Sequence, residues 1–356
     1  MVKRFGILTS GGDAPGLNAA IRAICITAKS KYGMEAVAIK NGYRGLIQGD
    51  MEPFEADLDA LLCSGGTVLG TSREKPFKNP IPDPKTGLLP VEAIRANCER
   101  MKLDALVCLG GNGTNTTASK LAESGFNVIG LPKTIDNDIV KTDITFGFHT
   151  AVDVATDSID RIQTTAKSHG RVMIVEVMGH KAGWLGLNAG IAGGGDVILI
   201  PEIPYSIESI AEKITSSSKT GKNYSIVVVA EGAKNPEEAK MSKKEFKAAR
   251  AAMTSSIAYR VAKELEEAIH LESRVSVLGY LQRGGNPTPY DRLLATRFGT
   301  AAAEFLANGD FGKLVAMQDD RITGVPLKDI AGQVKNVPLD SPLIESARNL
   351  GICFGD

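Results

Sequence analysis

Short apolar runs alternate with amphipathic stretches along most of this chain. The runs are residues 5–8, 37–39, 105–109, 128–131, 171–177, 197–200, 226–230 and 273–278. Each ends at glycine or polar residues, which is typical of strands buried on both faces of a parallel sheet. Between them lie stretches with helical spacing, such as Leu17, Ala20, Ile21 and Ile24. The pattern predicts an α/β fold with parallel sheets between layers of helices.

Two of the predicted strands lead into similar glycine turns. The first turn contains Gly11-Gly12-Asp13, and the second is Gly110-Gly111-Asn112-Gly113-Thr114. A glycine turn before a helix presents main-chain N–H groups at the positive end of the helix dipole, and this arrangement binds phosphate. Such turns also occur in parallel sheets that bind nothing there. Two copies in one chain favour a shared phosphate ligand over that alternative.

The run at 128–131 ends in a polar segment, Pro132–Asp138, where open α/β sheets place their ligands. Asp136 and Asp138 are close enough in sequence to divide two tasks. One carboxylate can accept the proton of an attacking hydroxyl while the other holds Mg²⁺ directly or through water. The pair could equally satisfy the local backbone as an Asx turn. Lys133 could neutralise a phosphate or pair with one of these carboxylates.

Three arginines, Arg171, Arg274 and Arg283, lie at the edges of predicted strands. Guanidinium groups bind phosphate through paired hydrogen bonds, so together they could hold a sugar phosphate. Taken singly, each could be a solvated surface residue. His180 lacks the partner spacing of a metal site and is interpreted as polar lining.

Composition and charge exclude several classes of partner. The chain has 356 residues and a formal net charge of zero. Its length predicts two lobes, and its charge does not favour nucleic acid or an anionic membrane. Its five cysteines lack C-x-x-C spacing, and no apolar run approaches the ~20 residues that span a bilayer. We expect a soluble cytoplasmic protein.

Four longer motifs occur in a fixed order. They are TSGGDAPGLNAAIR (Thr9–Arg22), PKTIDNDI (Pro132–Ile139), VEVMGHKAGW (Val175–Trp184) and GYLQRGGNPTPYDR (Gly279–Arg292). Together they resemble the 6-phosphofructokinase family, in particular its bacterial ATP-using members, over about residues 5–309. The resemblance implies transfer of the γ-phosphate of ATP to the 1-hydroxyl of fructose 6-phosphate, with Mg²⁺ as cofactor.

The resemblance also implies the architecture. The family fold has two Rossmann-like lobes, each a mostly parallel sheet sandwiched by helices. By analogy, residues 1–147 with 282–331 form the nucleotide-binding lobe. Residues 148–281 with 332–356 form the sugar-phosphate-binding lobe.

Particular residues take roles by analogy with the family. Asp136 matches the general base, and Thr134, Asp138 and His180 lie near the transferred phosphoryl group. Nucleotide contacts fall on Gly12, Tyr43, Arg73, Asn112, Gly113, Thr114 and Lys133. Substrate contacts fall on Thr134, Asp136, Met178, Gly179, His180, Glu231, Tyr280 and Arg283. Arg171 and Arg274 match arginines that reach the sugar phosphate across a subunit boundary, which implies at least a dimer and, in the family, usually a tetramer.

Some residues depart from the family pattern of ATP users. Asn112 stands where an Mg²⁺-linked Asp is usual, so it is the expected metal ligand with a weaker affinity. Lys133 and Tyr280 match the pyrophosphate-using branch. Gly113, however, leaves room for the α-phosphate of a nucleotide, where Asp would crowd and repel it. We therefore favour ATP, with pyrophosphate as the alternative donor.

Two further alternatives belong to other classes of protein. A non-catalytic regulatory subunit is suggested by Asn112 and His180, which replace charged residues, although Asp136, Thr134 and Arg171 are retained. A nicotinamide dehydrogenase would share the parallel sheet, but the first strand is not followed by G-x-G-x-x-G and a later acidic residue.

Overall fold

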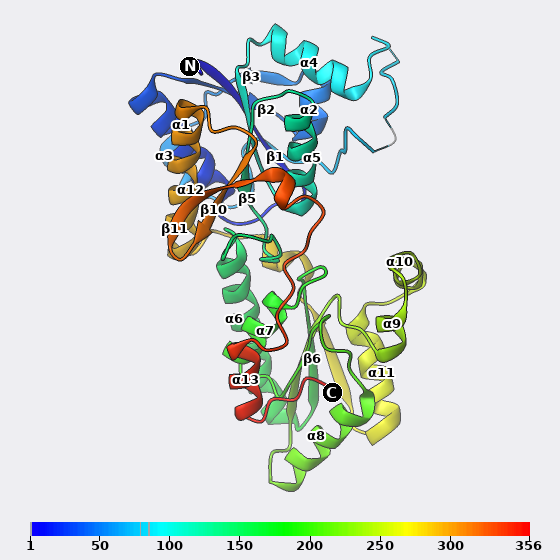
Figure 1. Cartoon of the computed structure of the whole chain (residues 1–356). Coiled ribbons are helices and arrows are strands. Elements are labelled where there is room, and N and C mark those ends of the chain that lie inside the picture. The colour runs from blue at the N-terminus through cyan, green and yellow to red at the C-terminus, as the bar shows by residue number, and fades with distance from the viewer. Residues whose placement is uncertain (1, 79, 85) are drawn as a thin grey trace. The chain divides into compact units, whose positions relative to one another are not determined.

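The computed structural model describes residues 2–78, 80–84 and 86–356. Its contacts divide the chain into two compact units. The first unit contains the residues up to Ile135, then Ile139–Thr150 and Arg283–Val334. The second contains Asp136–Asp138, Ala151–Gln282 and Lys335–Asp356. Each unit has its own sheet and its own apolar core (Figure 1).

The sheet of the first unit has seven strands among the described residues, in the order β11-β10-β5-β4-β1-β2-β3. The strands are β1 (Arg4–Ser10), β2 (Glu35–Ile39), β3 (Met51–Pro53), β4 (Ala105–Gly110), β5 (Val128–Pro132), β10 (Lys313–Gln318) and β11 (Arg321–Pro326). The five central strands run parallel, and the two edge strands, β3 and β11, are antiparallel to their neighbours.

Helices cover both faces of this sheet because successive strand side chains point to opposite faces. One face packs on α1 (Leu17–Tyr32), α3 (Leu58–Leu61) and α12 (Pro289–Asn308). The other packs on α2 (Tyr43–Gln48), α4 (Pro90–Arg100), α5 (Asn112–Glu123) and the 3₁₀ turn η2 (Leu327–Asp329). The core is therefore built in two apolar layers, one on each side of the strands.

The carboxyl ends of three neighbouring strands are in register. Ser10 of β1 pairs with Gly110 of β4, and Gly110 pairs with Pro132 of β5. Both glycine turns and the segment that begins at Lys133 therefore leave the same edge of the sheet. This edge is where parallel sheets bind ligands.

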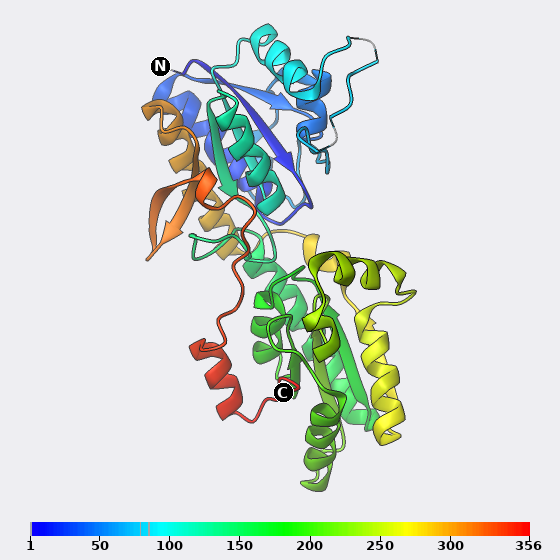
Figure 2. The same cartoon turned by 45° about the vertical axis from the view of Figure 1, so that its right-hand side comes forward.

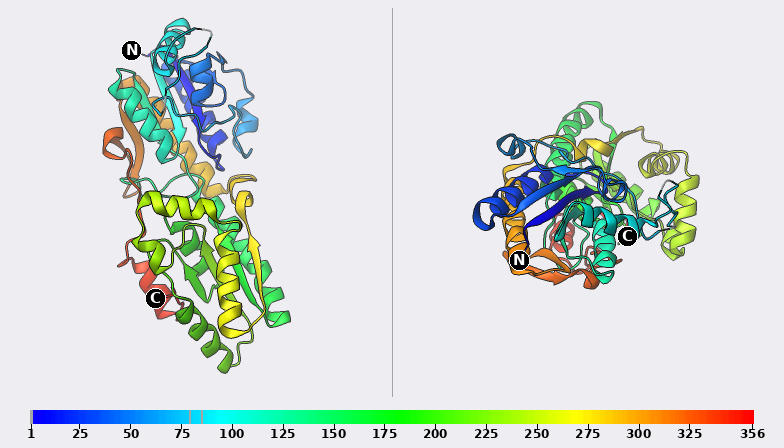
Figure 3. Two further views of the ribbon diagram at one scale, coloured as in Figure 1. Left: turned by 90° about the vertical axis from the view of Figure 1, so that its right-hand side faces the viewer. Right: turned by 90° about the horizontal axis from the view of Figure 1, so that it is seen from above.

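The second unit is a smaller parallel sheet with the order β7-β8-β6-β9. Its strands are β6 (Val172–Val177), β7 (Val197–Leu199), β8 (Ser225–Ala230) and β9 (Ser273–Val277). One face packs on α6 (Phe148–His169) and α7 (Trp184–Ala192), and the other on α8 (Ile207–Lys219) and α11 (Ile257–Ile269). Figure 3 shows α11, in yellow-green, beside the green strands that it covers. Helix α6 begins in the first unit and continues in the second.

In two parts of the chain the sequence pattern leaves the secondary structure open. The charged stretch 243–268 forms two helices, α10 (Lys243–Ala252) and α11, after the short α9 (Pro236–Lys240). The stretch beyond residue 309, where apolar periodicity is weak, forms β10 and β11 of the first unit and α13 (Pro342–Asn349) of the second (Figure 2). α13 packs beside α7 through Ile344 and Ala347.

The predicted fold class, parallel sheets between helices, is confirmed by this architecture. Among the helices that the structure describes, none combines the length and apolarity needed to cross a bilayer.

Candidate active site

The first glycine turn follows β1 and is braced by a neighbouring loop. Gly11 has a φ of +85°, a conformation that residues with a Cβ rarely adopt. Its N–H donates to the carbonyl oxygen of Ser72 at 2.9 Å, and Thr71 Oγ1 donates to the Gly11 carbonyl oxygen at 2.6 Å. Arg73, a predicted nucleotide contact, follows this loop directly and is exposed. The protein itself therefore fixes the course of this turn.

The second glycine turn joins β4 to α5. A Cβ built on Gly110 would lie 2.2 Å from Thr114 Oγ1, so only glycine fits there. Thr114 Oγ1 donates to the carbonyl oxygen of Ser10 at 3.1 Å, which ties this turn to the end of β1. α5 begins at Asn112, and its first turn contains no acidic residue. Asn112 and Gly113 therefore lie at the positive end of a helix.

Tyr43 supports the second turn from the core. It is 1% exposed, and its hydroxyl donates to the Thr114 carbonyl oxygen at 2.9 Å. Burial raises the pKa of the phenol well above its ordinary value, so the hydroxyl remains a donor. The resemblance assigned Tyr43 to the nucleotide, whereas the structure places it inside the unit, under the main chain of the turn.

Lys133 is a buried cation at the first turn. It is 2% exposed, and its Nζ donates to the carbonyl oxygen of Ser10 at 3.2 Å and to that of Gly12. A Cβ built on Gly11 would lie 3.6 Å from Thr114 Oγ1 and 4.0 Å from Lys133 Nζ. Predicted residues of both turns and of the following segment are thus brought together in the first unit. A positive charge beside the two glycine turns favours a bound anion.

Arg283 also reaches the first turn. Its Nη1 donates to the Asp13 carbonyl oxygen at 2.9 Å. A Cβ on Gly12 would lie 2.6 Å from the same nitrogen, so Gly12 allows the guanidinium to pack on the main chain. The resemblance assigned Arg283 to the sugar phosphate. The structure places the guanidinium on the phosphate turn of the first unit.

Thr134 and the two predicted catalytic carboxylates are buried. Thr134 is 7% exposed, and its carbonyl oxygen accepts from Thr145 Oγ1 at 2.7 Å. Asp136 and Asp138, which belong to the second unit, are 8% and 4% exposed. Asn137 between them has a φ of +49°, so the chain bends sharply at this point.

A second group of predicted residues gathers where β6 and β8 end. The Met178 N–H donates to Gln282 Oε1 at 3.2 Å, and the His180 N–H donates to Glu231 Oε1 at 2.8 Å. Gly179 has a φ of +137°, and a Cβ there would lie 2.7 Å from the Ala182 carbonyl oxygen. The structure therefore brings together the predicted sugar-phosphate residues Met178, Gly179, His180 and Glu231.

Gln282 was not selected from the sequence, although it lies within the GYLQRGG motif. It is fully buried, and its Nε2 donates to the Gly279 carbonyl oxygen at 3.1 Å. It therefore joins the turn after β9 to Met178 at the end of β6. Tyr280, two residues earlier, is 77% exposed.

Arg171 and Arg274 lie at the opposite end of the same sheet. Arg171 precedes β6, and Arg274 pairs with Met173 near the start of that strand. Both guanidiniums bind Glu272, which accepts from Arg171 Nε at 2.7 Å and from Arg274 Nη2. At about 3.3 Å per strand residue, Met173, the partner of Arg274, lies about 16 Å from Met178 along the chain, and Arg171 lies about 23 Å from it. Within one chain, the structure does not bring these arginines to the other sugar-phosphate residues.

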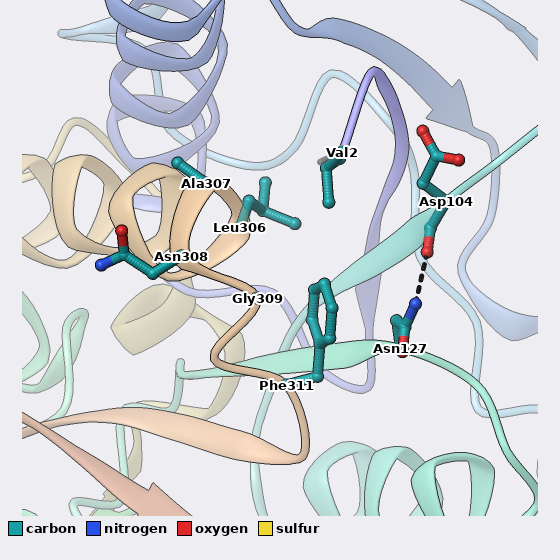
Figure 4. A pocket seen from close by; sticks show the side chains of 8 residues that line it. All are labelled: Val2, Asp104, Asn127, Leu306, Ala307, Asn308, Gly309 and Phe311. Atoms are coloured by element: carbon teal, nitrogen blue, oxygen red, sulfur yellow. Dashed lines mark hydrogen bonds between the residues drawn. The ribbon is translucent and has the colours of Figure 1, made fainter.

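The first unit also has a pocket of about 300 Å³ that is not this site. Figure 4 shows it lined by Val2, Asp104, Asn127 and Phe311, with Asn127 Nδ2 donating to the Asp104 carbonyl oxygen at 2.9 Å. Val2, Asp104 and Asn127 precede β1, β4 and β5. The pocket therefore lies at the amino ends of the strands, whereas the glycine turns leave their carboxyl ends.

Comparison with known protein families assigns the chain to one of them. Residues 4–306 match the profile of the family described as phosphofructokinase. The chain belongs to the phosphofructokinase family. The family predicted from the four motifs is thereby confirmed, and so is the prediction that the chain is a phosphotransferase.

The chain is similar to relatives whose names give two different phosphoryl donors, ATP and pyrophosphate. An ATP-dependent 6-phosphofructokinase of Spirochaeta thermophila is 58% identical, with 99% of this chain and 98% of that one covered. ATP-dependent 6-phosphofructokinase 3 of Bacteroides thetaiotaomicron is 51% identical, covering 99% and 100%. A pyrophosphate–fructose 6-phosphate 1-phosphotransferase of Amycolatopsis methanolica is 46% identical, covering 94% and 96%.

Solved structures show the same fold. The phosphofructokinase of Pichia pastoris in the T-state superposes with a TM-score of 0.79 at 33% identity, covering 93% of this chain and 35% of that longer one. A pyrophosphate-dependent phosphofructokinase of Nitrosospira multiformis gives a TM-score of 0.83 at 23% identity, covering 99% and 93%.

Proposed function

We propose that this phosphofructokinase transfers the γ-phosphate of ATP to the 1-hydroxyl of fructose 6-phosphate, giving fructose 1,6-bisphosphate and ADP in glycolysis. The relatives named as ATP-dependent, at 58% and 51% identity over nearly the whole chain, support this activity. The observation that carries the proposal is the alignment of Ser10, Gly110 and Pro132 on neighbouring strands. Two phosphate-binding turns and the segment that leads to Asp136 leave the sheet at one edge.

In the proposed reaction, Asp136 is the general base. Its carboxylate accepts the proton of the sugar 1-hydroxyl as that oxygen attacks the γ-phosphorus, and ADP leaves with the β–γ bridging oxygen. Thr134, Asp138 and His180 are proposed to lie near the transferred group. Most of the catalysis is expected from positioning and charge stabilisation, since phosphoryl transfer needs little covalent chemistry from the protein.

The nucleotide is proposed to lie on the first unit. The main chain at Gly12, Gly113 and Thr114 offers N–H groups to its phosphates, and Lys133 supplies a fixed positive charge. The exposed Arg73 is free to turn toward a nucleotide, whereas the buried Tyr43 acts through the main chain of Thr114.

Mg²⁺ fits this site as a partner of the nucleotide phosphates. The described residues contain no cluster of three or more His, Cys, Asp or Glu side chains that could hold a metal. Mg²⁺ bound to nucleotides often keeps waters and takes only one or two protein ligands. Asn112, at the start of α5, is proposed to contribute its amide oxygen. When bound, the ion neutralises charge on the transferred phosphate.

The donor is tested by initial rates with ATP and with pyrophosphate, each at saturating fructose 6-phosphate and in its absence. We expect turnover with ATP that requires the sugar. Turnover with pyrophosphate alone would replace the proposed donor with that of the Amycolatopsis methanolica relative. No turnover with either donor would favour the regulatory-subunit alternative.

Gly113→Asp sharpens the choice of donor. A Cβ built on Gly113 would meet no atom within 4 Å, so the structure has room for a side chain there. The new carboxylate would repel the α-phosphate of ATP but not the shorter pyrophosphate. We expect kcat/KM for ATP to fall at least 10-fold with unchanged thermal stability. An unchanged value for ATP would remove Gly113 from donor selection.

The sugar phosphate is proposed to bind Met178, Gly179, His180, Glu231, Tyr280 and Arg283, with Thr134 and Asp136 at the acceptor hydroxyl. Arg171 and Arg274 lie at the other end of β6, which supports their proposed action across a subunit boundary. The enzyme is therefore proposed to be at least a dimer, with a tetramer expected from the family. Light scattering of the purified protein tests this. We also propose a cytoplasmic location, with no nucleic-acid or membrane partner.

A further inference from the structure

The bend at Asp136–Asp138 contacts a segment from the far end of the chain. The N–H of Lys335 donates to the carbonyl oxygen of Asp138 at 2.8 Å. The Nζ of the same lysine donates to Asn137 Oδ1 at 3.0 Å. One residue thus binds two successive residues of the bend, once through its main chain and once through its side chain.

Lys335 is itself held by Trp184, the first residue of α7. Trp184 Nε1 donates to the Lys335 carbonyl oxygen at 2.8 Å. The Nζ lies 5.4 Å from the centre of the Trp184 ring, within the range of a cation–π interaction. These contacts restrict both the main chain and the ammonium group of Lys335.

A partly buried carboxylate, that of Glu202, anchors the same segment two residues later. Glu202 Oε1 accepts from the Val337 N–H at 2.9 Å and from the Gly183 N–H at 3.0 Å. Burial raises the pKa of Glu202, although these main-chain donors oppose the rise. Val337 is 2% exposed and packs with α7 and α13. We call residues 335–337 the tail strap, since they link the bend to the turn at 183–184.

We propose that Lys335 is a positioning residue, which holds the Asp136–Asp138 bend in the geometry that the reaction needs. This inference rests on the proposed function of Asp136. Asn137 has a left-handed backbone, whose cost in free energy is offset by neighbouring contacts. The bond from the lysine ammonium to Asn137 is charge-assisted and supplies such a contact. A small displacement of a catalytic group can lower a rate by up to about 10²-fold.

The test compares Lys335→Met and Lys335→Arg with the wild-type enzyme. Methionine keeps the main-chain bond to Asp138 and most of the stem but removes the ammonium group. We expect kcat to fall about 10-fold in Lys335→Met, with KM for ATP and for fructose 6-phosphate within about twofold. Arginine keeps a charged donor, so Lys335→Arg is expected to recover most of kcat. Lys219→Met, at an exposed position near the end of α8, is the matched control and should behave as wild type.

Trp184 gives a readout that does not depend on turnover, because it is the sole tryptophan of the chain. Its emission should change in Lys335→Met and stay unchanged in Lys219→Met. Wild-type kcat in Lys335→Met, or a loss of kcat that Lys335→Arg fails to restore, would overturn the positioning role. Unchanged Trp184 emission in Lys335→Met would overturn the strap contact. A wild-type enzyme that is inactive with both donors would instead overturn the proposed function.

Discussion

The two units hold their candidate functional residues in different ways. In the first unit, functional side chains donate to main-chain carbonyl oxygens: Lys133 to Ser10 and Gly12, Thr114 to Ser10, Tyr43 to Thr114 and Arg283 to Asp13. In the second unit, the acceptors are side chains. The guanidiniums of Arg171 and Arg274 bind Glu272, whereas His180 and Met178 donate their main-chain N–H groups to Glu231 and Gln282.

This difference predicts different responses to mutation. A site built on the main chain depends on glycine, so an added Cβ should damage the fold as well as activity. A site built on exposed ion pairs can lose one member with little effect on stability. Loss of such a residue should instead weaken substrate binding. The Asp136–Asp138 bend follows neither pattern, because it is bound by Lys335, which lies 198 residues after Asn137 in the sequence.

The largest expected effect is that of Asp136→Ala. Removal of the proposed general base should lower kcat at least about 10³-fold, or about 4 kcal/mol of transition-state stabilisation. The variant should still fold, because the substitution leaves the apolar cores of both units intact. Coupled assays and thermal unfolding measure the two quantities. Asp153→Ala, at an exposed position of α6, is the control. A retained rate in Asp136→Ala would exclude Asp136 from the mechanism.

In the first unit, sequence alone could identify residues that are marked by a short pattern of neighbouring residues. Gly11 and Gly110 come at or just after the ends of apolar runs in the sequence. An apolar run that ends at glycine indicates both a buried strand and the turn that follows it. Most strands and helices were predicted for the same reason, since apolar periodicity is a short-range pattern. Register between strands then follows from burial of one face or both.

Side-chain partners could not be predicted, because they depend on which distant segments the fold brings together. Arg171 precedes β6, and Glu272 precedes β9, about a hundred residues later in the chain. The two side chains form an ion pair only because β6 and β9 are neighbours in the sheet. Lys335 lies in a stretch with weak periodicity and resembles any surface lysine. Charged residues run through the whole stretch 243–268, so the sequence pattern allows one helix or two there, and the structure has two, α10 and α11.

Gly110→Ala should show the dependence of the first unit on its main chain. The new Cβ would lie 2.2–2.5 Å from three atoms of the Thr114 side chain, so the turn must shift. We expect a loss of about 1–3 kcal/mol in the free energy of unfolding, with weaker ATP binding. Gly113→Ala is the matched control, since its Cβ has open space and alanine favours a helix. Equal stability of the two variants in urea would contradict the close fit at Gly110.

Arg171→Met should show the opposite behaviour in the second unit. Its ion pair with Glu272 is partly exposed, so unfolding should change by less than about 1 kcal/mol. A lost guanidinium–phosphate contact should raise KM for fructose 6-phosphate about 10-fold or more, with a smaller change in kcat. Arg161→Met is the control, because Arg161 also pairs with a carboxylate, at 2.7 Å, on an exposed surface. A KM equal to that of the control would remove Arg171 from substrate binding.

The smallest expected effect is a pH dependence in the first unit. His149 is partly buried, with its ring centre 4.0 Å from that of Tyr290. Burial lowers the pKa of His149, although Asp291 partly opposes this. Below about pH 6.5 the unfolded chain therefore takes up a proton that the folded chain resists, and stability falls as the pH drops.

His149→Gln removes this proton uptake, so the stability of the variant relative to wild type should increase as the pH is lowered from 8 to 5. The expected change in the difference between their unfolding midpoints is about 2 °C or less. His169→Gln, at the exposed end of α6, controls for loss of a histidine as such. A difference that stays constant between pH 8 and pH 5 would show that burial does not perturb His149.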